Sequence, residues 1–450
     1  MRTVNRRFVV IFTVSLIILG VAVYFFQRFQ VRRNARFFYD RALQAQAEGK
    51  VPDAIRNLQW YVEFVPTDTE AAARLGELLV EAKADGAAFF RLESVLRRDP
   101  SRSDSRRLLV DILLRMGRFR DAQAHLEQYL LKEFPEDADL LAKWGRCLRG
   151  LRQPERALSV LQQAIEKDPA LEDAYLQAAA ITRYDLKRPE EGDAWIDRLL
   201  KAVPDSATAK YAAAVYFYEL KDYAKSYELA SQSAEQSPQN VQVMLLAADT
   251  ALRTDKPEES KRWAERVLKA DPESPDGYAL LSSASLRLEG VDAAIKILEE
   301  GITKVKSRDR DRLLWTLASL ELDVGRADSA EARVEALTKS AYDPPRVRYL
   351  RGRLLAQKEQ WYEAVQTLEQ ARTGLIDQPD LLKQVDFWLG VCYGQMGNLD
   401  QSFAAYAKAV NQDPLWPQAR LGRAAAFAEL GRVDEAVAEY RTSVQMNQLS

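Results

Sequence analysis

Apolar and polar residues are distributed in two different ways along this chain of 450 residues. Residues 8–26, FVVIFTVSLIILGVAVYFF, form an apolar run of 19 residues without a charge or a proline. After this run, apolar positions are interspersed with charged ones in short stretches that are typical of amphipathic helices. The pattern predicts one membrane-spanning helix followed by a long series of short helices.

The apolar run has the length of a membrane anchor. A helix rises about 1.5 Å per residue, so the run would span about 28 Å, close to the thickness of a bilayer's hydrocarbon core. Arginines flank it on both sides: Arg2, Arg6, Arg7, Arg28, Arg32, Arg33 and Arg36. We therefore predict a short basic tail over residues 1–7, a transmembrane signal-anchor helix over residues 8–27 and a helical-repeat region over residues 28–450.

Two other interpretations of the run are less favourable. A buried core helix of a globular protein would need a face polar enough to meet water, and this run has none. A cleaved signal peptide would have an apolar region of about 7–15 residues and a small-x-small cleavage site, which does not follow here. The arginine counts at the two ends do not decide the orientation. The arginine-rich start resembles an export signal, which favours the extracytoplasmic side for the rest of the chain.

Prolines and small residues recur at nearly constant intervals beyond the run. The prolines stand 34 or 35 residues apart, with one gap before Pro344: Pro66, Pro100, Pro135, Pro169, Pro204, Pro238, Pro272, Pro344, Pro379 and Pro414. About twelve positions before most of them lies a small residue: Ala54, Ala88, Ala122, Ala157, Gly192, Ser226, Ser260, Ala294, Ala330, Ala364, Ser402 and Ala436. Twelve positions earlier lies a second set, small except at Val110: Ala42, Gly76, Val110, Gly145, Ala180, Ala214, Ala248, Ser282, Ala318, Gly352, Gly390 and Ala424.

Paired small residues indicate a close crossing of two helices in each of about twelve repeats. Helix backbones approach closely only where the side chains between them are small. Leucines four positions after the second small residue are expected to fill the space beside the crossing: Leu58, Leu92, Leu126, Leu161, Leu298 and Leu368. Glycines are expected in the turn between the two helices: Gly49, Gly117, Gly325, Gly397 and Gly431. The proline is expected to end the second helix.

This pattern resembles the tetratricopeptide repeat. One copy reads Leu141-x-x-Trp144-Gly145-x-x-Leu148, then Ala157-x-x-x-Leu161, then Pro169. Another reads Leu389-Gly390-x-x-Tyr393, then Ser402-x-x-x-Tyr406, then Pro414. The resemblance covers roughly residues 35–450 and implies an all-α solenoid of about twelve helix-turn-helix repeats, preceded here by the transmembrane helix.

Composition and charge argue against catalysis and nucleic-acid binding. The formal net charge is −2, so no basic field is available to hold a nucleic acid. His125 is the single histidine, and Cys147 and Cys392 are the only cysteines, which leaves little material for a metal site. No Gly-rich phosphate loop, Cys-x-x-Cys, His-Glu-x-x-His or Gly-x-Ser-x-Gly motif occurs. We therefore predict no enzyme activity, no cofactor and no small-molecule substrate.

The resemblance also implies where a partner would bind. In tetratricopeptide repeats the first helix of each repeat lines a concave groove, through positions three before and one and four after the first small residue. The candidate groove residues are Tyr184, Tyr211, Tyr218, Trp315, Tyr349, Phe387, Arg107 and Arg146. Trp315, Tyr349 and Phe387 share one repeat position, so they are expected either to form a continuous docking strip or to pack between neighbouring repeats. No Lys-x-x-x-Asn pair lies on a groove face, so the family's clamp for acidic carboxyl ends is not expected.

The predicted function is that of a membrane-anchored scaffold that binds partner proteins or peptides, in envelope assembly, secretion or polymer export. The alternative is the regulatory arm of a larger enzyme or complex. The last repeat ends at Gln448-Leu449-Ser450 without the polar capping helix that solenoids usually need. We therefore expect either that the chain continues or that a partner covers that end.

Overall fold

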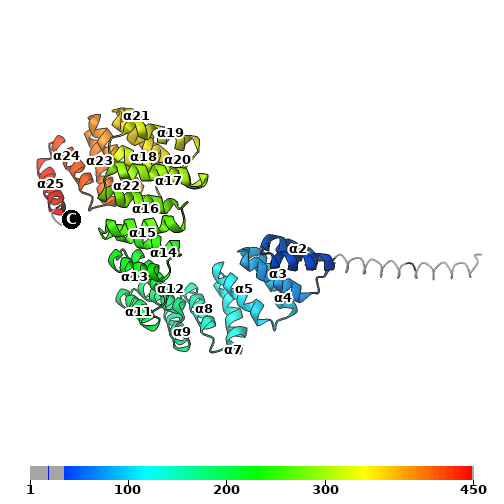
Figure 1. The fold of residues 1–450 in the computed structure, drawn as a ribbon. Coiled ribbons are helices and arrows are strands. Elements are labelled where there is room, and N and C mark those ends of the chain that lie inside the picture. The colour runs from blue at the N-terminus through cyan, green and yellow to red at the C-terminus, as the bar shows by residue number, and fades with distance from the viewer. Residues whose placement is uncertain (1–18, 20–34, 448–450) are drawn as a thin grey trace, which may run out of the picture. The chain divides into compact units, whose positions relative to one another are not determined.

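The computed structural model describes residue 19 and residues 35–447, and every regular element among them is a helix (Figure 1). The predicted anchor at residues 8–27 lies outside the described residues, apart from Leu19. Within the described ranges, no helix combines the length and the apolar character that a membrane crossing requires.

Helix contacts divide the chain into two bodies, 1–205 and 206–450, here called the N-terminal body and the C-terminal body. The N-terminal body holds five repeats. Their helices are a first helix over residues 35–47, α2 (Val51–Phe64), α3 (Thr69–Glu81), α4 (Asp85–Arg98), α5 (Ser103–Arg115), α6 (Phe119–His125), η1 (Leu126–Leu130), α7 (Leu131–Glu133), α8 (Ala138–Gly150), α9 (Pro154–Lys167), α10 (Glu172–Ala180), η2 (Ile181–Asp185) and α11 (Pro189–Ala202).

The C-terminal body holds seven repeats, each a pair of α-helices. These are α12 (Ala207–Glu219), α13 (Tyr223–Gln236), α14 (Val241–Arg253), α15 (Pro257–Ala270), α16 (Pro275–Leu288), α17 (Val291–Lys304), α18 (Ser307–Asp323), α19 (Ala327–Lys339), α20 (Pro344–Gln357), α21 (Trp361–Gly374), α22 (Pro379–Gln395), α23 (Leu399–Gln412), α24 (Pro417–Glu429) and α25 (Val433–Asn447). The prediction of twelve helix pairs is therefore confirmed. That one superhelix runs through residues 28–450 stays a prediction.

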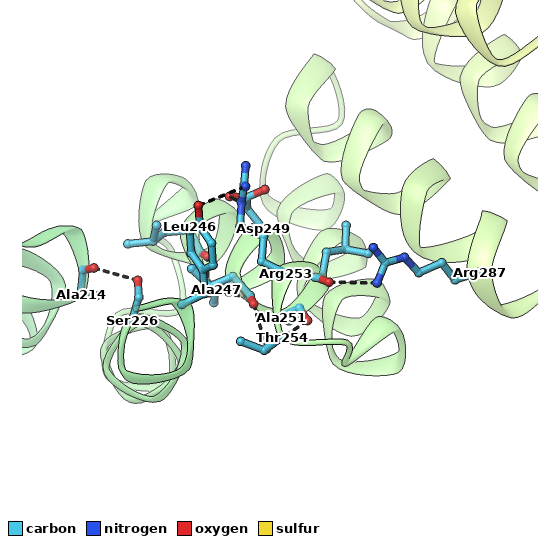
Figure 2. Close-up of polar contacts among 12 residues, drawn as sticks. Ala214, Ser226, Leu246, Ala247, Asp249, Ala251, Arg253, Thr254 and Arg287 are labelled. Carbon is cyan, nitrogen blue, oxygen red and sulfur yellow. Dashed lines mark hydrogen bonds and ion pairs between the residues drawn. The ribbon is translucent and has the colours of Figure 1, made fainter. Parts of the chain in front are cut away.

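The small residues lie where the two helices of a repeat cross, as predicted. A Cβ atom added to Gly145 would stand 2.6 Å from Leu161, and one added to Gly352 would stand 2.6 Å from Leu368. In three repeats the small pair includes a serine whose hydroxyl donates a hydrogen bond across the crossing. These bonds are Ser226 to the Ala214 carbonyl at 2.7 Å (Figure 2), Ser282 to Ala294 at 3.0 Å and Ser402 to Gly390 at 2.8 Å. The six leucines beside the crossings are all buried: Leu58, Leu92, Leu126, Leu161, Leu298 and Leu368.

The turn between the paired helices uses a left-handed residue in every repeat. The five glycines expected there have φ angles between +69° and +79°, and Gly290 has φ +95°. Six other repeats place a residue with a side chain in this conformation: Lys83, Arg152, Lys187, Lys221, Asp255 and Glu359. The turn geometry therefore belongs to the repeat, and glycine is only one way to meet it.

Two π-helical turns account for the two long proline steps before Pro238. The steps that end at Pro135 and Pro204 have 35 residues, and η1 and η2 lie within these two steps. A π-turn takes one more residue than an α-turn, so it absorbs the insertion without breaking the helix. As a result, the residues of η2 are turned relative to their counterparts in other repeats.

The first helices of successive repeats form the inner layer within each body. In the N-terminal body α3 contacts α5, α5 contacts α8 and α8 contacts α10. In the C-terminal body the direct contacts run from α12 through α14, α16, α18, α20 and α22 to α24. Elements that lie close across repeats occupy the concave side of a solenoid, so the inner face is the one formed by the first helices.

The two cysteines and the histidine are packing residues. Cys147 and Cys392 are buried and free, and burial raises the pKa of each thiol to about 12. His125 Nδ1 lies 3.0 Å from the guanidinium of Arg106, and burial together with that charge lowers the pKa of the imidazole. No group of three His, Cys, Asp or Glu side chains within residues 35–447 is arranged to hold a metal ion.

Candidate partner-binding surface

Ion pairs between neighbouring repeats line the inner face of the N-terminal body. Arg107 of α5 binds Asp137 at 2.7 Å, and Lys143 of α8 binds Asp111 of α5 at 2.8 Å. Both acceptors are carboxylates one repeat away from their cation. The predicted groove residue Arg107 is thus half-buried and already engaged, and its guanidinium also lies 4.7 Å from the centre of the Phe134 ring. Arg107 therefore links two neighbouring repeats of the chain.

Arg146 and Tyr184 are the predicted groove residues that remain open on this face. Arg146 is exposed on α8, and the structure gives it no ion pair among the described residues. The Tyr184 ring is 43% exposed on η2. Arg149 binds Asp185 at 2.6 Å, which holds the end of α8 against the end of η2. Asp185 directly follows Tyr184, and Arg149 lies one turn after Arg146. This ion pair therefore holds the two helices that carry the Arg146 guanidinium and the Tyr184 ring next to each other.

Tyr211 and Tyr218, on α12 of the C-terminal body, are less available. Tyr211 is half-buried and packs against the apolar cluster that contains Ala214 and Val243. The Tyr218 ring packs edge-on against Tyr223 at 5.5 Å. Burial and a hydrogen bond with Asp249 raise the pKa of Tyr218 to about 12, so its hydroxyl stays protonated at physiological pH. The side chains of both tyrosines therefore make most of their contacts within the chain.

The expected aromatic strip is not an open surface, and this corrects the prediction for Tyr349. Tyr349 is only 1% exposed. Its hydroxyl donates to Gln384 of the next repeat at 2.5 Å, and its ring lies beside the buried guanidinium of Arg353. Arg353 in turn binds Asp323 of the preceding repeat at 2.5 Å. The ring is therefore core between three repeats, which is the second of the two outcomes expected for this position.

Trp315 and Phe387 are half-buried, because a cationic side chain packs against the first ring and aromatic side chains pack against the second. The guanidinium of Arg346 lies 5.8 Å from the centre of the Trp315 ring, and the indole nitrogen of Trp315 is buried without a partner among the described residues. Phe387 packs against the rings of Tyr406 and Trp416 at 5.7 and 5.0 Å. The three residues share one repeat position, yet no continuous exposed strip results.

The first repeat carries an exposed cluster that the sequence analysis did not single out. Phe38 lies at its centre, stacked 5.8 Å from Phe64 and 6.3 Å from Trp60, with Phe37 at 5.6 Å. Phe37, Trp60 and Phe64 are 53%, 49% and 38% exposed. We call these four residues the aromatic patch. A signal was present in the sequence, because the other repeats carry mostly polar or small residues at the positions of Trp60 and Phe64.

Each body is a stack of paired helices, which is the architecture of a helical-repeat protein. Models of the tetratricopeptide repeat match residues 107–172, 178–241, 217–284, 316–379 and 389–448. These segments cover more than half of the chain. The chain therefore belongs to the tetratricopeptide repeat family, as its sequence pattern indicated.

The chain is also similar to individual proteins and solved structures. The TPR repeat-containing protein YpiA of Bacillus subtilis (strain 168) is 21% identical over 342 residues, which cover 66% of this chain and 78% of YpiA. The crystal structure of yeast Tom70 is 16% identical, with 92% of each chain covered and a TM-score of 0.47. The APC/C hetero-tetramer Cut9–Hcn1 is 12% identical, with 92% and 94% covered and a TM-score of 0.46. These likenesses concern the repeat fold.

Proposed function

We propose that this protein is a membrane-anchored scaffold, held by residues 8–27, that docks a segment of a partner protein on the inner face of its N-terminal body. The repeat family supports binding of proteins or peptides as the general activity. The apolar run and its flanking arginines support the anchor. The export-like start of the chain supports an extracytoplasmic position for the repeats, with a role in envelope assembly, secretion or polymer export.

One observation carries the docking site: Arg146 and Tyr184 are open on adjoining inner helices, while the charges around them are paired. Arginine and tyrosine are the residue types that most often contribute large binding energies in interfaces. The paired charges, Arg107 with Asp137 and Lys143 with Asp111, hold the surface in one arrangement before a partner arrives. A partner segment with a carboxylate for Arg146 and an apolar side chain for the Tyr184 ring fits this surface.

Alanine substitution of these two residues tests the site. Full-length protein is purified from membranes with its bound partners, which are identified by mass spectrometry. In Arg146→Ala and Tyr184→Ala, the partner should be reduced or lost, because loss of an interface anchor costs about 2 kcal/mol, roughly thirtyfold in affinity. Arg156→Ala, on the second helix of the same repeat, and Tyr362→Ala, on α21, are exposed controls that should retain it. Equal retention by all four variants contradicts the site.

Removal of the apolar run tests the anchor separately. Full-length protein should float with vesicles and resist alkaline extraction, whereas a chain that lacks residues 1–27 should be soluble and keep its helical content. A mature amino terminus near residue 30 would contradict the anchor without affecting the docking site.

A second candidate function, the regulatory arm of a larger complex, is favoured by one helix face. Val433, Val437, Tyr440 and Val444 form an exposed apolar stripe along α25, at the spacing of one helix face. Such a stripe is usually covered by another protein surface. Native mass spectrometry of the detergent-extracted protein tests this candidate. A regulatory arm should be found with an enzyme subunit bound in a fixed ratio, and Val437→Lys should release that subunit.

A further inference from the structure

We infer that the aromatic patch of the first repeat lies on the surface of the membrane that holds the anchor, so that the first repeat contacts the bilayer. This inference rests on the proposed anchoring and adds a second, peripheral contact with lipid. The patch consists of Phe37, Phe38, Trp60 and Phe64, within the described residues.

The patch departs from the repeat in a specific way. Trp60 stands six positions after the small residue Ala54. The ten other repeats without a π-turn in the second helix place no aromatic residue there: Ser94, Gln163, Arg198, Gln232, Arg266, Glu300, Ala336, Gln370, Lys408 and Thr442. In the repeat with η1, the ring of Tyr129 is covered by the guanidinium of Arg106 at 3.8 Å. Packing of the repeat therefore does not require Trp60.

Phe64 is a second aromatic residue at a position where the other repeats have none. It stands ten positions after Ala54, where other repeats have charged, polar or small residues such as Arg98, Lys167 and Gln236. Among the other repeats, Met446, in the last repeat, is the single large apolar residue at this count. Two apolar rings one turn apart thus replace two polar side chains on one face of α2, beside Phe38.

Phe37 is exposed at a position that is otherwise core. It stands five positions before Ala42, and the residue at this position is buried in each of the other eleven repeats. In those repeats the first helix packs against the second helix of the preceding repeat, as α5 does against α4. The other exposed aromatic rings of residues 35–447, such as Phe90 and Tyr362, contact no second exposed ring. The patch is thus a concentrated apolar surface of the kind that marks a contact site.

Position and charge favour a lipid surface as the occupant. Phe37 follows Phe26, the end of the apolar run, by eleven residues, so the patch lies within about 40 Å of the bilayer even for a fully extended chain. The sequence from the apolar run to the patch has Asp40 as its single acid over residues 27–41 and is rich in arginine: Arg28, Arg32, Arg33, Arg36 and Arg41. Arg41 lies 4.8 Å from the centre of the Phe37 ring. Tryptophan, phenylalanine and arginine together are typical of surfaces that enter the headgroup region of anionic membranes.

A depth measurement on the full-length protein tests the inference. An environment-sensitive fluorophore is attached at Gln59→Cys, beside the patch, and in a second protein at Gln162→Cys, the same residue at the same repeat position in the fourth repeat. Both sites are exposed. The native thiols of Cys147 and Cys392 are buried with a pKa raised to about 12, so they react little under native conditions. The proteins are reconstituted in vesicles of phosphatidylcholine with about one-third phosphatidylglycerol, an anionic lipid.

The expected result is selective contact of the first site with lipid. A nitroxide on the lipid headgroup should quench the fluorophore at position 59 several-fold more than the one at position 162. Trp60→Gln with Phe64→Lys, which copies Gln163 and Lys167 of the fourth repeat, should reduce quenching at position 59 to the level at 162. Its melting temperature verifies that this variant folds.

Three results would overturn the inference. Equal quenching at the two sites, or quenching at position 59 that persists in the double variant, shows that the patch does not hold the membrane. Protection of position 59 from aqueous iodide without lipid quenching assigns the patch to a second copy or another protein. Failure of the protein to float with the vesicles overturns the anchor as well, so loss of the anchor and loss of the patch contact are distinguished.

Discussion

The inner faces of α5–α8–η2 and of α18–α20–α22 are built from similar residues but differ in what they leave open. Both have arginines that reach carboxylates of a neighbouring repeat, as Arg149 does with Asp185 and Arg353 with Asp323. In the N-terminal stretch the pairs lie at the surface and the Tyr184 ring is exposed. In the C-terminal stretch Arg353 and Tyr349 are 2% and 1% exposed and fill the space between repeats.

The difference shows that an aromatic residue at an inner position is not by itself a docking residue. Tyr349 finds a hydrogen-bond acceptor, Gln384, and a cation, Arg353, within its own chain. Tyr184 lies in a π-turn that shifts its register relative to other repeats. Bulges of this kind are frequent at functional sites. Aromatic residues near the inner face can therefore stabilise the solenoid or remain available for a partner.

The largest expected effect is that of Tyr349→Ala, which removes a buried ring from the C-terminal stretch. Loss of a large buried aromatic side chain costs about 3–5 kcal/mol. Urea unfolding should show this loss, with Tyr362→Ala, 61% exposed, as the control that stays within about 0.5 kcal/mol. A near-native unfolding curve for Tyr349→Ala would mean that the ring is an open docking residue after all.

Replacing the glycine at a helix crossing with leucine should lower the stability of both stretches to a similar extent. A Cβ atom at Gly145 would lie 2.6 Å from Leu161, and one at Gly390 would lie 2.8 Å from Tyr406. Gly145→Leu and Gly390→Leu should each cost about 1–3 kcal/mol or more through overpacking. Amide hydrogen exchange should show the damage first in adjacent repeats, because stability is shared with neighbours. An unchanged melting curve for either variant would place the crossing elsewhere.

Two carboxylates should respond to pH with opposite sign. Burial raises the pKa of Glu321, on α18, above 4.5, although its Oε1 lies 3.6 Å from Nε of Arg333. Its contribution to stability is therefore present below pH 4.5 and is lost as pH rises through the folded pKa. Glu321→Gln should stabilise the protein at pH 7, because it removes a charge whose desolvation outweighs the attraction of Arg333, and the gain should shrink in acid.

The matched carboxylate of the N-terminal body is Asp85, at the start of α4. A hydrogen bond from Arg115 lowers the pKa of Asp85 below 3.8, so its stabilisation is present above pH 3.8 and is lost as pH falls through the folded value. Asp85→Asn should destabilise the protein at pH 7 by less than about 1 kcal/mol, as expected for an exposed pair. Melting temperatures measured from pH 4 to pH 8 should show the two variants on opposite sides of wild type. A shift in the same direction would refute this assignment.

The smallest expected effect on stability is that of Tyr184→Ala. An exposed side chain away from packing contacts changes the free energy of unfolding by about 0.5 kcal/mol or less. Thermal melting should therefore leave this variant close to wild type while its partner capture is reduced. A large drop in melting temperature would show that Tyr184 resembles Tyr349 and is structural.

The repeat phase could be predicted from sequence because it depends on residue size at fixed spacing. The pair Gly145 and Ala157, and the leucine at 161, take the positions that steric fit demands. Exposure of inner residues could not be predicted, since the burial of Tyr349 depends on Gln384 in the next repeat. The 35-residue steps showed that an extra residue was present, but not that a π-turn would absorb it beside Tyr184. The aromatic patch was missed because Trp60 is informative only when compared with its counterparts.

The most direct test of the proposed scaffold function is site-specific photocrosslinking in native membranes. A benzophenone amino acid is placed at Tyr184 in one protein and at Gln395, which is exposed at the end of α22, in another. The N-terminal inner face should yield a discrete crosslinked partner from position 184, reduced by Arg146→Ala, with none from position 395. Crosslinks from position 395 and none from position 184 would contradict the account.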